Sequence, residues 1–197
     1  ADPQIRKWEK LASALTPMAK YYNAETSNSL IYDAIQVLGG SGFTEDYDVA
    51  RIYRAAHIMT IYDGTTQIQV NAAIGGIVSG MSAKGNLRDY FTERLGAYAS
   101  SDLSKDLYKQ FEEIVELYKD LPTSEKKGEL SFEVVQSATR VLIGMLLEET
   151  AKKLQSEEAR ADREAMAFEY NVDTEGQLAA NRIRLRRLGN QPAVAAV

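Results

Sequence analysis

Residues that break helices are rare in this sequence, which has 13 glycines and 4 prolines among 197 residues. This count argues against a turn-rich all-β fold and favours long helices. Apolar residues recur every three or four positions over most of the chain, as they do along the buried face of an amphipathic helix. The sequence therefore predicts an all-α fold, an up-down helical bundle followed by a second helical unit, with short links between the helices.

The first expected helix begins at Asp2 and Pro3, a capping residue followed by a proline at the first helical position. Thr16-Pro17 is either a second helix start or a kink in one long helix. The helical pattern stops at the glycine-rich residues 39–42. Two further helices follow, and their candidate caps are Thr44 or Asp46 for one and Asp63 or Thr65 for the other.

A shift in composition near residues 80–86 divides the chain into a glycine-punctuated first part and a more charged second part. We therefore predict a bundle over residues 1–82, a helical extension over residues 83–188 and a flexible tail over residues 189–197. The elements expected within the extension are an amphipathic helix ended by Pro122, a charged loop over residues 122–130, a helix with a stripe from Phe132 to Glu149, and a charged helix over residues 157–188 weakened at Gly176.

Composition excludes several kinds of site. The chain has no cysteine, which excludes disulfides and thiolate ligands, and its single histidine, His57, rules out a two-histidine zinc site. A net charge of −5 argues against a general electrostatic grip on nucleic acid or anionic lipid. No stretch approaches the roughly 20 apolar residues of a membrane span, and we expect a cytoplasmic protein. The opening Ala1-Asp2-Pro3 is neither an initiator methionine nor a signal peptide, so a mature protein and a fragment fit equally.

Two irregular segments interrupt the helices and are the places where chemistry could occur. The first, residues 36–42, carries Gly39, Gly40 and Gly42 directly after a helix. Glycines there let the backbone approach a ligand closely and expose amide groups to a phosphate. The alternative is an ordinary glycine cap with a turn, which ends many helices. Taken alone, the local pattern favours the cap.

The second segment, residues 62–67, places Asp63 beside Gly64 directly before a helix. Asp63 is either an N-cap or a general base, and the two roles require opposite environments. Capping amides and the helix dipole stabilise a carboxylate, whereas a dry pocket favours its protonated form. Taken alone, this segment favours the cap.

Together the two segments form a longer pattern, residues 35–69, which read IQVLGGSGFTEDYDVARIYRAAHIMTIYDGTTQIQ. This stretch resembles the signature near the end of the acyl-CoA dehydrogenase family, Q-V-x-G-G-x-G-[YF]-T-E-D-x-P-V-x-R-x-x-R-D-A-R followed by [IV]-Y-E-G-T-x-Q-I-Q. The helices before and after it suit the family's C-terminal four-helix bundle. The chain beyond about residue 85 resembles, more weakly, the extra helical extension of longer members.

The resemblance implies oxidation of an acyl-CoA thioester to a trans-2-enoyl-CoA, with FAD as the cofactor and an electron-transfer flavoprotein as the electron acceptor. Asp63 stands where the family has its catalytic Glu, so it would remove the α-proton while its backbone N–H binds the thioester oxygen. Thr65 and Gln67 match positions near the flavin of their own subunit. The residues that match positions at the adenine-diphosphate end of FAD, bound by a neighbouring subunit, are Gln36, Val37, Leu38, Gly39 and Gly40. A shared site implies a homo-oligomer, a dimer or a tetramer.

The sequence departs from the family pattern at several positions. Asp63 is one methylene shorter than Glu, a difference of about 1.5 Å in reach. Ala55 and His57 replace an Asp and an Arg, and Asp48 replaces a Pro; we expect a structural role for His57. The family's domains that carry most flavin and acyl-CoA contacts are missing, so the chain alone should be inactive and bind FAD weakly.

Two rival functions fit the same scaffold. One is a non-catalytic helical module that binds a partner or nucleic acid, which the shorter Asp63 supports. The other is a flavin monooxygenase. The dehydrogenase interpretation requires the two glycine-bearing segments to meet, within one chain or between paired subunits. Four arginines lie near the end of the chain: Arg182, Arg184, Arg186 and Arg187. We interpret them as favourable charges at a helix C-terminus. A nucleic-acid contact is the less favoured alternative, since the total charge of the chain is negative.

Overall fold

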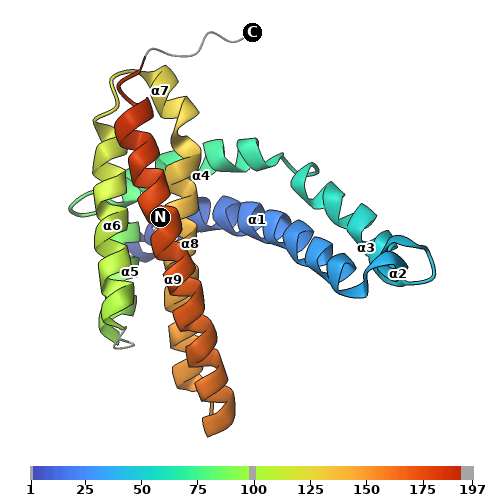
Figure 1. The fold of residues 1–197 in the computed structure, drawn as a ribbon. Coiled ribbons are helices and arrows are strands. Elements are labelled where there is room, and N and C mark those ends of the chain that lie inside the picture. The colour runs from blue at the N-terminus through green and yellow to red at the C-terminus, as the bar shows by residue number, and fades with distance from the viewer. Residues whose placement is uncertain (1, 98–100, 192–197) are drawn as a thin grey trace.

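The structure is a computed structural model that describes residues 2–97 and 101–191. These residues form nine α-helices and one short 3-10 helix, and no strand, which confirms the all-α fold (Figure 1). Residues 192–197 of the predicted tail lie outside the described part. The elements are α1 (Pro3–Leu38), α2 (Gly40–Phe43), α3 (Asp48–His57), η1 (Ile58–Thr60), α4 (Thr66–Gly80), α5 (Asn86–Ala97), α6 (Asp102–Lys119), α7 (Ser124–Glu129), α8 (Ser131–Lys153) and α9 (Glu157–Leu188).

The first helix, α1, is continuous over 36 residues. It begins as the sequence predicts, because the carboxylate of Asp2 accepts a 2.9 Å hydrogen bond from the backbone N–H of Gln4. Pro17 lies inside the helix, so a second helix start at this proline is wrong. At 1.5 Å per residue, α1 is about 54 Å long, and it is the longest helix in the described part of the chain.

The helices form a bundle from which a two-layered arm projects (Figure 1). In the bundle, α8 and α9 pack along each other and α6 packs on both. The first half of α1 packs against α4, α5 and α8. Its second half leaves the bundle, and α3 returns along it after the chain reverses at α2. We call residues 20–68, from the middle of α1 to the beginning of α4, the arm.

The core lies in the bundle and is built mainly from aromatic and branched side chains. Phe91 and Phe111 are fully buried, with ring centroids 5.6 Å apart. Ile77 of α4 belongs to the same buried cluster as Val135 of α8 and Leu178 of α9. The cluster therefore joins helices from both sides of residue 82, and the division into two units at that residue stays a prediction.

Two local expectations are wrong. Residues 122–130 are not a loop throughout, because the Thr123 hydroxyl accepts a hydrogen bond from Lys126 N–H and caps the short helix α7. Neither Thr44 nor Asp46 caps α3, which begins after Tyr47 without a side-chain cap. Gly176 lies inside α9, which runs unbroken over 32 residues, and the weakness predicted at this glycine stays a prediction.

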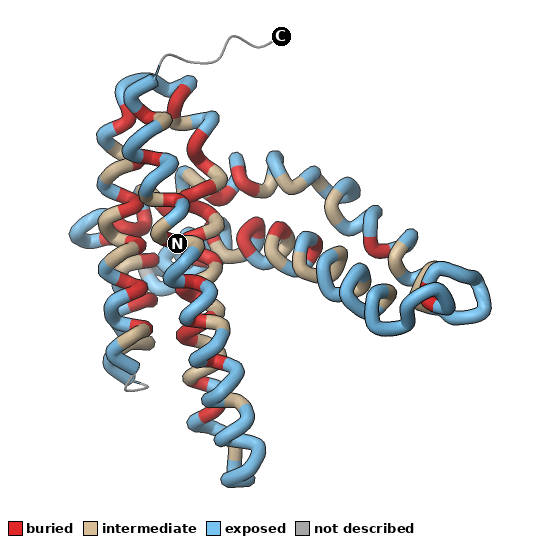
Figure 2. Tube along the Cα trace, viewed as in Figure 1, coloured by how far each residue is buried: buried red, intermediate tan, exposed pale blue. Residues whose placement is uncertain are grey.

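Burial differs sharply between the bundle and the arm (Figure 2). Buried residues follow the facing sides of the bundle helices, whereas the outer part of α1, α2 and α3 is mostly exposed. In the arm beyond Tyr21, the buried residues are Ala24, Gly42 and Ala56. Both candidate segments are therefore mostly exposed on the surface of the arm.

Candidate active-site segments

The first segment lies at the tip of the arm, where α1 ends. Gly39 adopts φ 59°, and its N–H donates to the carbonyl of Gln36 at 3.2 Å. This left-handed conformation favours glycine. A Cβ built on Gly39 or Gly40 would meet nothing within 4 Å, and Val37 is 87% exposed. The tip is therefore open, and its backbone is free of side-chain bulk, as close approach by a diphosphate requires.

A third glycine shapes the tip without being exposed. A Cβ on Gly42 would lie 2.9 Å from both the carbonyl oxygen of Ile35 and the Cβ of Leu38. The backbone of α2 therefore lies directly against the last turn of α1. Gly42 is a requirement of packing, and it holds Gly39 and Gly40 at the outer edge of the tip.

The second segment is the turn between η1 and α4. Asp63 has φ 52°, and it is the single residue other than glycine with a positive φ in the described part of the chain. Gly64 follows with φ 94°. The carbonyl of Asp63 accepts a 2.8 Å hydrogen bond from the side-chain amide of Gln69. The left-handed backbone is one that aspartate tolerates better than most residues, and it leaves the Asp63 side chain exposed.

Lys20 fixes this turn to α1. Its ammonium group donates to the carbonyl of Met59 at 2.8 Å and to that of Gly64 at 2.6 Å. The same group lies 5.7 Å from the ring centroid of Tyr62. The lysine thus joins both ends of the turn to one helix. Sequence reasoning missed Lys20, because no local pattern reveals a contact between residues 44 positions apart.

Asp63 does not cap the helix that follows it. The helix α4 begins at Thr66, and Thr65 occupies the capping position without a side-chain hydrogen bond. The prediction that Asp63 caps this helix is therefore wrong, whereas the alternative, Thr65, stands at the N-cap position but makes no capping hydrogen bond. The hydroxyl of Thr66 instead hydrogen-bonds to the carboxylate of Glu25 on α1. The Asp63 carboxylate is left available for a different role.

The two residues predicted to lie near the flavin, Thr65 and Gln67, belong to the same segment as Asp63. Thr65 and Gln67 are exposed, and the Gln67 amide donates to the side chain of Asn71 at 3.0 Å. His57 is exposed and stands edge-on to the ring of Tyr53, with centroids 4.7 Å apart. Thr65 and Gln67 thus share the neighbourhood of Asp63.

The two segments do not meet within one chain. Asp63 lies in the turn that Lys20 holds, whereas Gly39 lies 19 positions further along α1. At 1.5 Å per residue this separates them by about 28 Å. Of the two expected arrangements, contact within a single chain is wrong, and contact between paired subunits stays a prediction.

Exposed apolar side chains are concentrated on the arm. Large exposed apolar patches are typical of surfaces that another protein covers. The large apolar residues of the arm with at least 40% exposure are Leu30, Tyr32, Val37, Leu38, Phe43, Tyr47, Ile52, Ile58, Met59, Ile61, Tyr62 and Ile68. They flank both candidate segments.

Three of the four C-terminal arginines form ion pairs within the chain. Arg182 and Arg186 both pair with Glu113 of α6, the first at 3.1 Å. Arg184 pairs at 2.6 Å with Glu133, which is buried. These arginines tie α9 to α6 and α8.

Comparison with known proteins finds a family model that matches the arm and the helical residues on either side of it. Residues 5–77 match the family model described as "Acyl-CoA dehydrogenase, C-terminal domain". Over these residues, the chain is similar to the C-terminal domain of acyl-CoA dehydrogenases. Both candidate segments fall within the match.

Individual acyl-CoA dehydrogenases and reductases show the same likeness. The chain is 42% identical over 65 residues to the mitochondrial long-chain specific acyl-CoA dehydrogenase of Sus scrofa, covering 33% of this chain and 15% of that protein. It is 38% identical over 76 residues to the caffeyl-CoA reductase-Etf complex subunit CarC of Acetobacterium woodii, covering 39% and 19%. With the 3-methylmercaptopropionyl-CoA dehydrogenase of Ruegeria pomeroyi it shares 35% identity over 97 residues, covering 49% and 16%.

The aligned stretches span less than a fifth of each of these relatives. No helix in the described part of the chain is both long and apolar enough to cross a membrane. Within residues 2–97 and 101–191, no group of three or more histidine or carboxylate side chains could hold a metal ion.

Proposed function

We propose that this chain is the C-terminal part of a longer FAD-dependent acyl-CoA dehydrogenase that converts an acyl-CoA thioester to a trans-2-enoyl-CoA. Asp63 is the base that removes the α-proton, and its backbone N–H donates to the thioester oxygen. The bound flavin supplies the hydride acceptor for the β-carbon. Thr65 and Gln67 lie beside the flavin of their own subunit.

The geometry of the Asp63 turn is the observation that carries this proposal. Two hydrogen bonds from Lys20 and one from Gln69 hold the backbone on either side of Asp63. The carboxylate is exposed and does not cap α4. A carboxylate placed on a braced left-handed turn is pre-positioned for a substrate, as a general base must be.

The tip of the arm fits a contact with the adenine-diphosphate part of FAD on a neighbouring subunit. Gly39 and Gly40 leave the backbone open, and the flanking residues Gln36, Val37 and Leu38 are exposed. The distance of about 28 Å from the Asp63 turn supports two different sites for the two segments. A homo-oligomer, a dimer or a tetramer, follows from this division, with the apolar surface of the arm as part of its interface.

The names of relatives support the partners of the reaction. Acyl-CoA thioesters appear in the names of the Sus scrofa and Ruegeria pomeroyi enzymes, and an Etf complex in that of the Acetobacterium woodii protein. We therefore expect an acyl-CoA substrate and an electron-transfer flavoprotein as the electron acceptor for this protein.

The decisive experiment changes the proposed base in the longer protein and follows bleaching of flavin absorbance by acyl-CoA. Asp63→Asn keeps the size of the side chain and removes its charge, so the rate should fall by at least about 100-fold. Asp63→Glu restores the family's residue and should retain or raise the rate, since about 1 Å of misplacement can cost 100-fold. Asp173→Asn, on the exposed side of α9, is the matched control and should leave the rate unchanged.

Full activity in the Asp63→Asn variant would contradict the proposal. Absence of flavin from the longer protein, with no turnover by either the native form or Asp63→Glu, would favour the non-catalytic helical module that the shorter carboxylate suggests. The purified 197-residue chain should bind FAD weakly and reduce no dye with any acyl-CoA, because most cofactor and substrate contacts of the family lie in other domains. Dye reduction by this chain would show that the proposed division of the site is wrong.

A further inference from the structure

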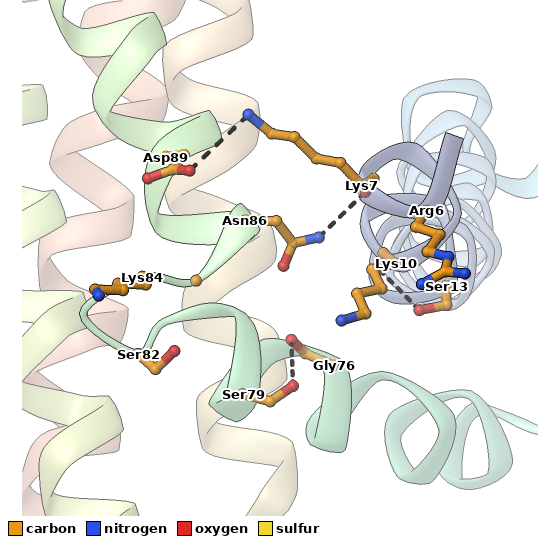
Figure 3. A pocket seen from close by; sticks show the side chains of 11 residues that line it. Arg6, Lys7, Lys10, Ser13, Gly76, Ser79, Ser82, Lys84, Asn86 and Asp89 are labelled. Atoms are coloured by element: carbon orange, nitrogen blue, oxygen red, sulfur yellow. Dashed lines mark hydrogen bonds and ion pairs between the residues drawn. The ribbon is translucent and has the colours of Figure 1, made fainter. Parts of the chain in front are cut away.

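A basic pocket lies at the root of α1, away from both candidate segments (Figure 3). It has a volume of about 590 Å³ and opens between the first turns of α1, the end of α4 and the turn that leads to α5. Small-molecule sites have volumes of about 300–1,000 Å³, so the pocket has room for more than a single ion. The side chains that determine its character are Arg6, Lys7, Lys10, Lys84, Ser82 and Asp89.

The pocket concentrates positive charge in a chain that is acidic as a whole. Four cationic side chains and one carboxylate give 4 − 1 = +3 by formal count, against −5 for the whole chain. Within the described residues, no carboxylate lies at ion-pair distance from Arg6, Lys10 or Lys84. Lys7 reaches across to Asp89 at 3.9 Å, and both groups are about half exposed, so this pair neutralises little. The surplus charge attracts an anion.

Neutral donors complete the lining. The helix α5 begins at Asn86 on the wall of the pocket, and the first N–H groups of a helix have no partner within it. The positive end of the helix dipole is added to the cations there. The Ser82 hydroxyl belongs to the same wall. Cations from two segments, a helix start and a hydroxyl thus surround one space.

We propose that this pocket binds a phosphate-bearing small molecule through a diphosphate group. A carboxylate would offset one of the three surplus charges, whereas a terminal phosphate carries about −1.5 to −2 at neutral pH and the second phosphate of a diphosphate adds a further negative charge. Lysine and arginine are the side chains that proteins use for phosphate. Lys10 lies 29 positions before Gly39 on α1, about 44 Å away, so this pocket is distinct from the proposed FAD contact.

The test uses inorganic pyrophosphate and the purified 197-residue chain in isothermal titration calorimetry at low salt. We expect saturable binding at one site that weakens several-fold when salt is raised to about 0.2 M, because exposed charges are screened. Lys10→Glu should weaken binding at least tenfold. Lys127→Glu on α7 makes the same change in charge away from the pocket and should leave affinity within twofold.

Two further measurements separate a pocket from a general effect of charge. Lys10→Arg keeps the cation and should retain affinity within a few-fold, and ADP should compete with pyrophosphate. No saturable binding of pyrophosphate, or equal losses in Lys10→Glu and Lys127→Glu, would overturn the proposal. Binding to phosphatidylglycerol vesicles without binding to pyrophosphate or ADP would also overturn it, because a flat charged surface rather than a pocket would then be responsible.

Discussion

At the scale of single residues, the turn that carries Asp63 depends on contacts that are remote in sequence. Asp63 has a left-handed backbone, which costs free energy for any residue with a side chain. The bonds from Lys20 and Gln69 to the carbonyls of this turn offset that cost. A lysine in the middle of a helix therefore decides the position of a carboxylate 43 residues later.

Replacing Lys20 tests this dependence. Lys20→Met keeps the aliphatic stem and removes both hydrogen bonds, so we expect about 1–2 kcal/mol less local stability in the turn. Amide hydrogen exchange over residues 59–64 should accelerate about 5- to 30-fold. The control Lys109→Met, at an exposed position of α6, should leave exchange in the turn unchanged. Equal exchange rates in the native chain and Lys20→Met would show that Lys20 does not brace the turn.

Buried tyrosine makes stability depend on alkaline pH. Burial, followed by the nearby Glu25 carboxylate, raises the pKa of Tyr21 to about 12. The unfolded chain releases this proton near pH 10, so the contribution is complete below pH 10 and is lost as pH rises through 12. Urea midpoints should fall between pH 10 and 12, and fall less in Tyr21→Phe. The pKa of Tyr170 is also raised by burial, so part of the fall should remain. Tyr32→Phe, at an exposed position, should not change the profile.

At the scale of helices, the periodic segments were predicted well and their ends poorly. The stripe on α8 is confirmed by the burial of Val135, Ala138 and Met145, since a period of three to four residues directly reports a buried face. The ends of α3 and α4 were not predicted, because several candidate caps stood close together and tertiary contacts chose among them. The Thr66 hydroxyl bonds to Glu25 across the arm, which no local pattern contains.

For the candidate site too, local features were predictable from the sequence, and their arrangement in space was not. Gly39 and Asp63 were found from short motifs, because both motifs are local. Their separation was not found, because it depends on the contact between Lys20 of α1 and the Asp63 turn, which no local pattern contains. The 19 helical positions between Lys20 and Gly39 then set the distance of about 28 Å.

Two glycines inside helices, Gly176 and Gly144, should change the free energy of unfolding in opposite directions when replaced by alanine. A Cβ on Gly176 would meet nothing within 4 Å, so Gly176→Ala should raise the free energy of unfolding by roughly 0.5–1 kcal/mol. A Cβ on Gly144 would lie 1.9 Å from the side-chain oxygen of the buried Asn171. Gly144→Ala should therefore lower it by about 1–3 kcal/mol. Urea unfolding of both variants measures these changes, and a stabilised Gly144→Ala would contradict the packing of α8 on α9.

At the scale of the whole molecule, one core joins the stretch that matches the family model to the helices that follow it. Phe111 of α6 is fully buried beside Phe91, in the cluster that also contains Ile77 of α4. The stability of α4 and of the first half of α1 should therefore depend on residues outside the matched stretch 5–77.

The phenylalanines provide a matched test of that shared core. Phe111→Ala should cost about 3–5 kcal/mol in the free energy of unfolding, because it leaves a cavity among packed helices. Phe168→Ala, at a position that is 64% exposed, makes the same chemical change and should cost within about 0.5 kcal/mol. Circular dichroism at increasing urea measures both. A single transition that shifts for Phe111→Ala would indicate one cooperative unit, and two separate transitions would indicate that the matched stretch and the helices that follow it unfold independently.

The continuity of α1 has a mechanical consequence. The helix is anchored in the bundle by Leu11, Ala14 and Met18, and its free end carries Gly39. It behaves as a lever: a tilt of about 5° at the anchor displaces a point about 28 Å away by roughly 2 Å. Displacements of about 1 Å are already large for a reacting pair. Side chains at the anchor would thus set, by angle alone, the placement of the proposed FAD contact at the tip, which they never touch.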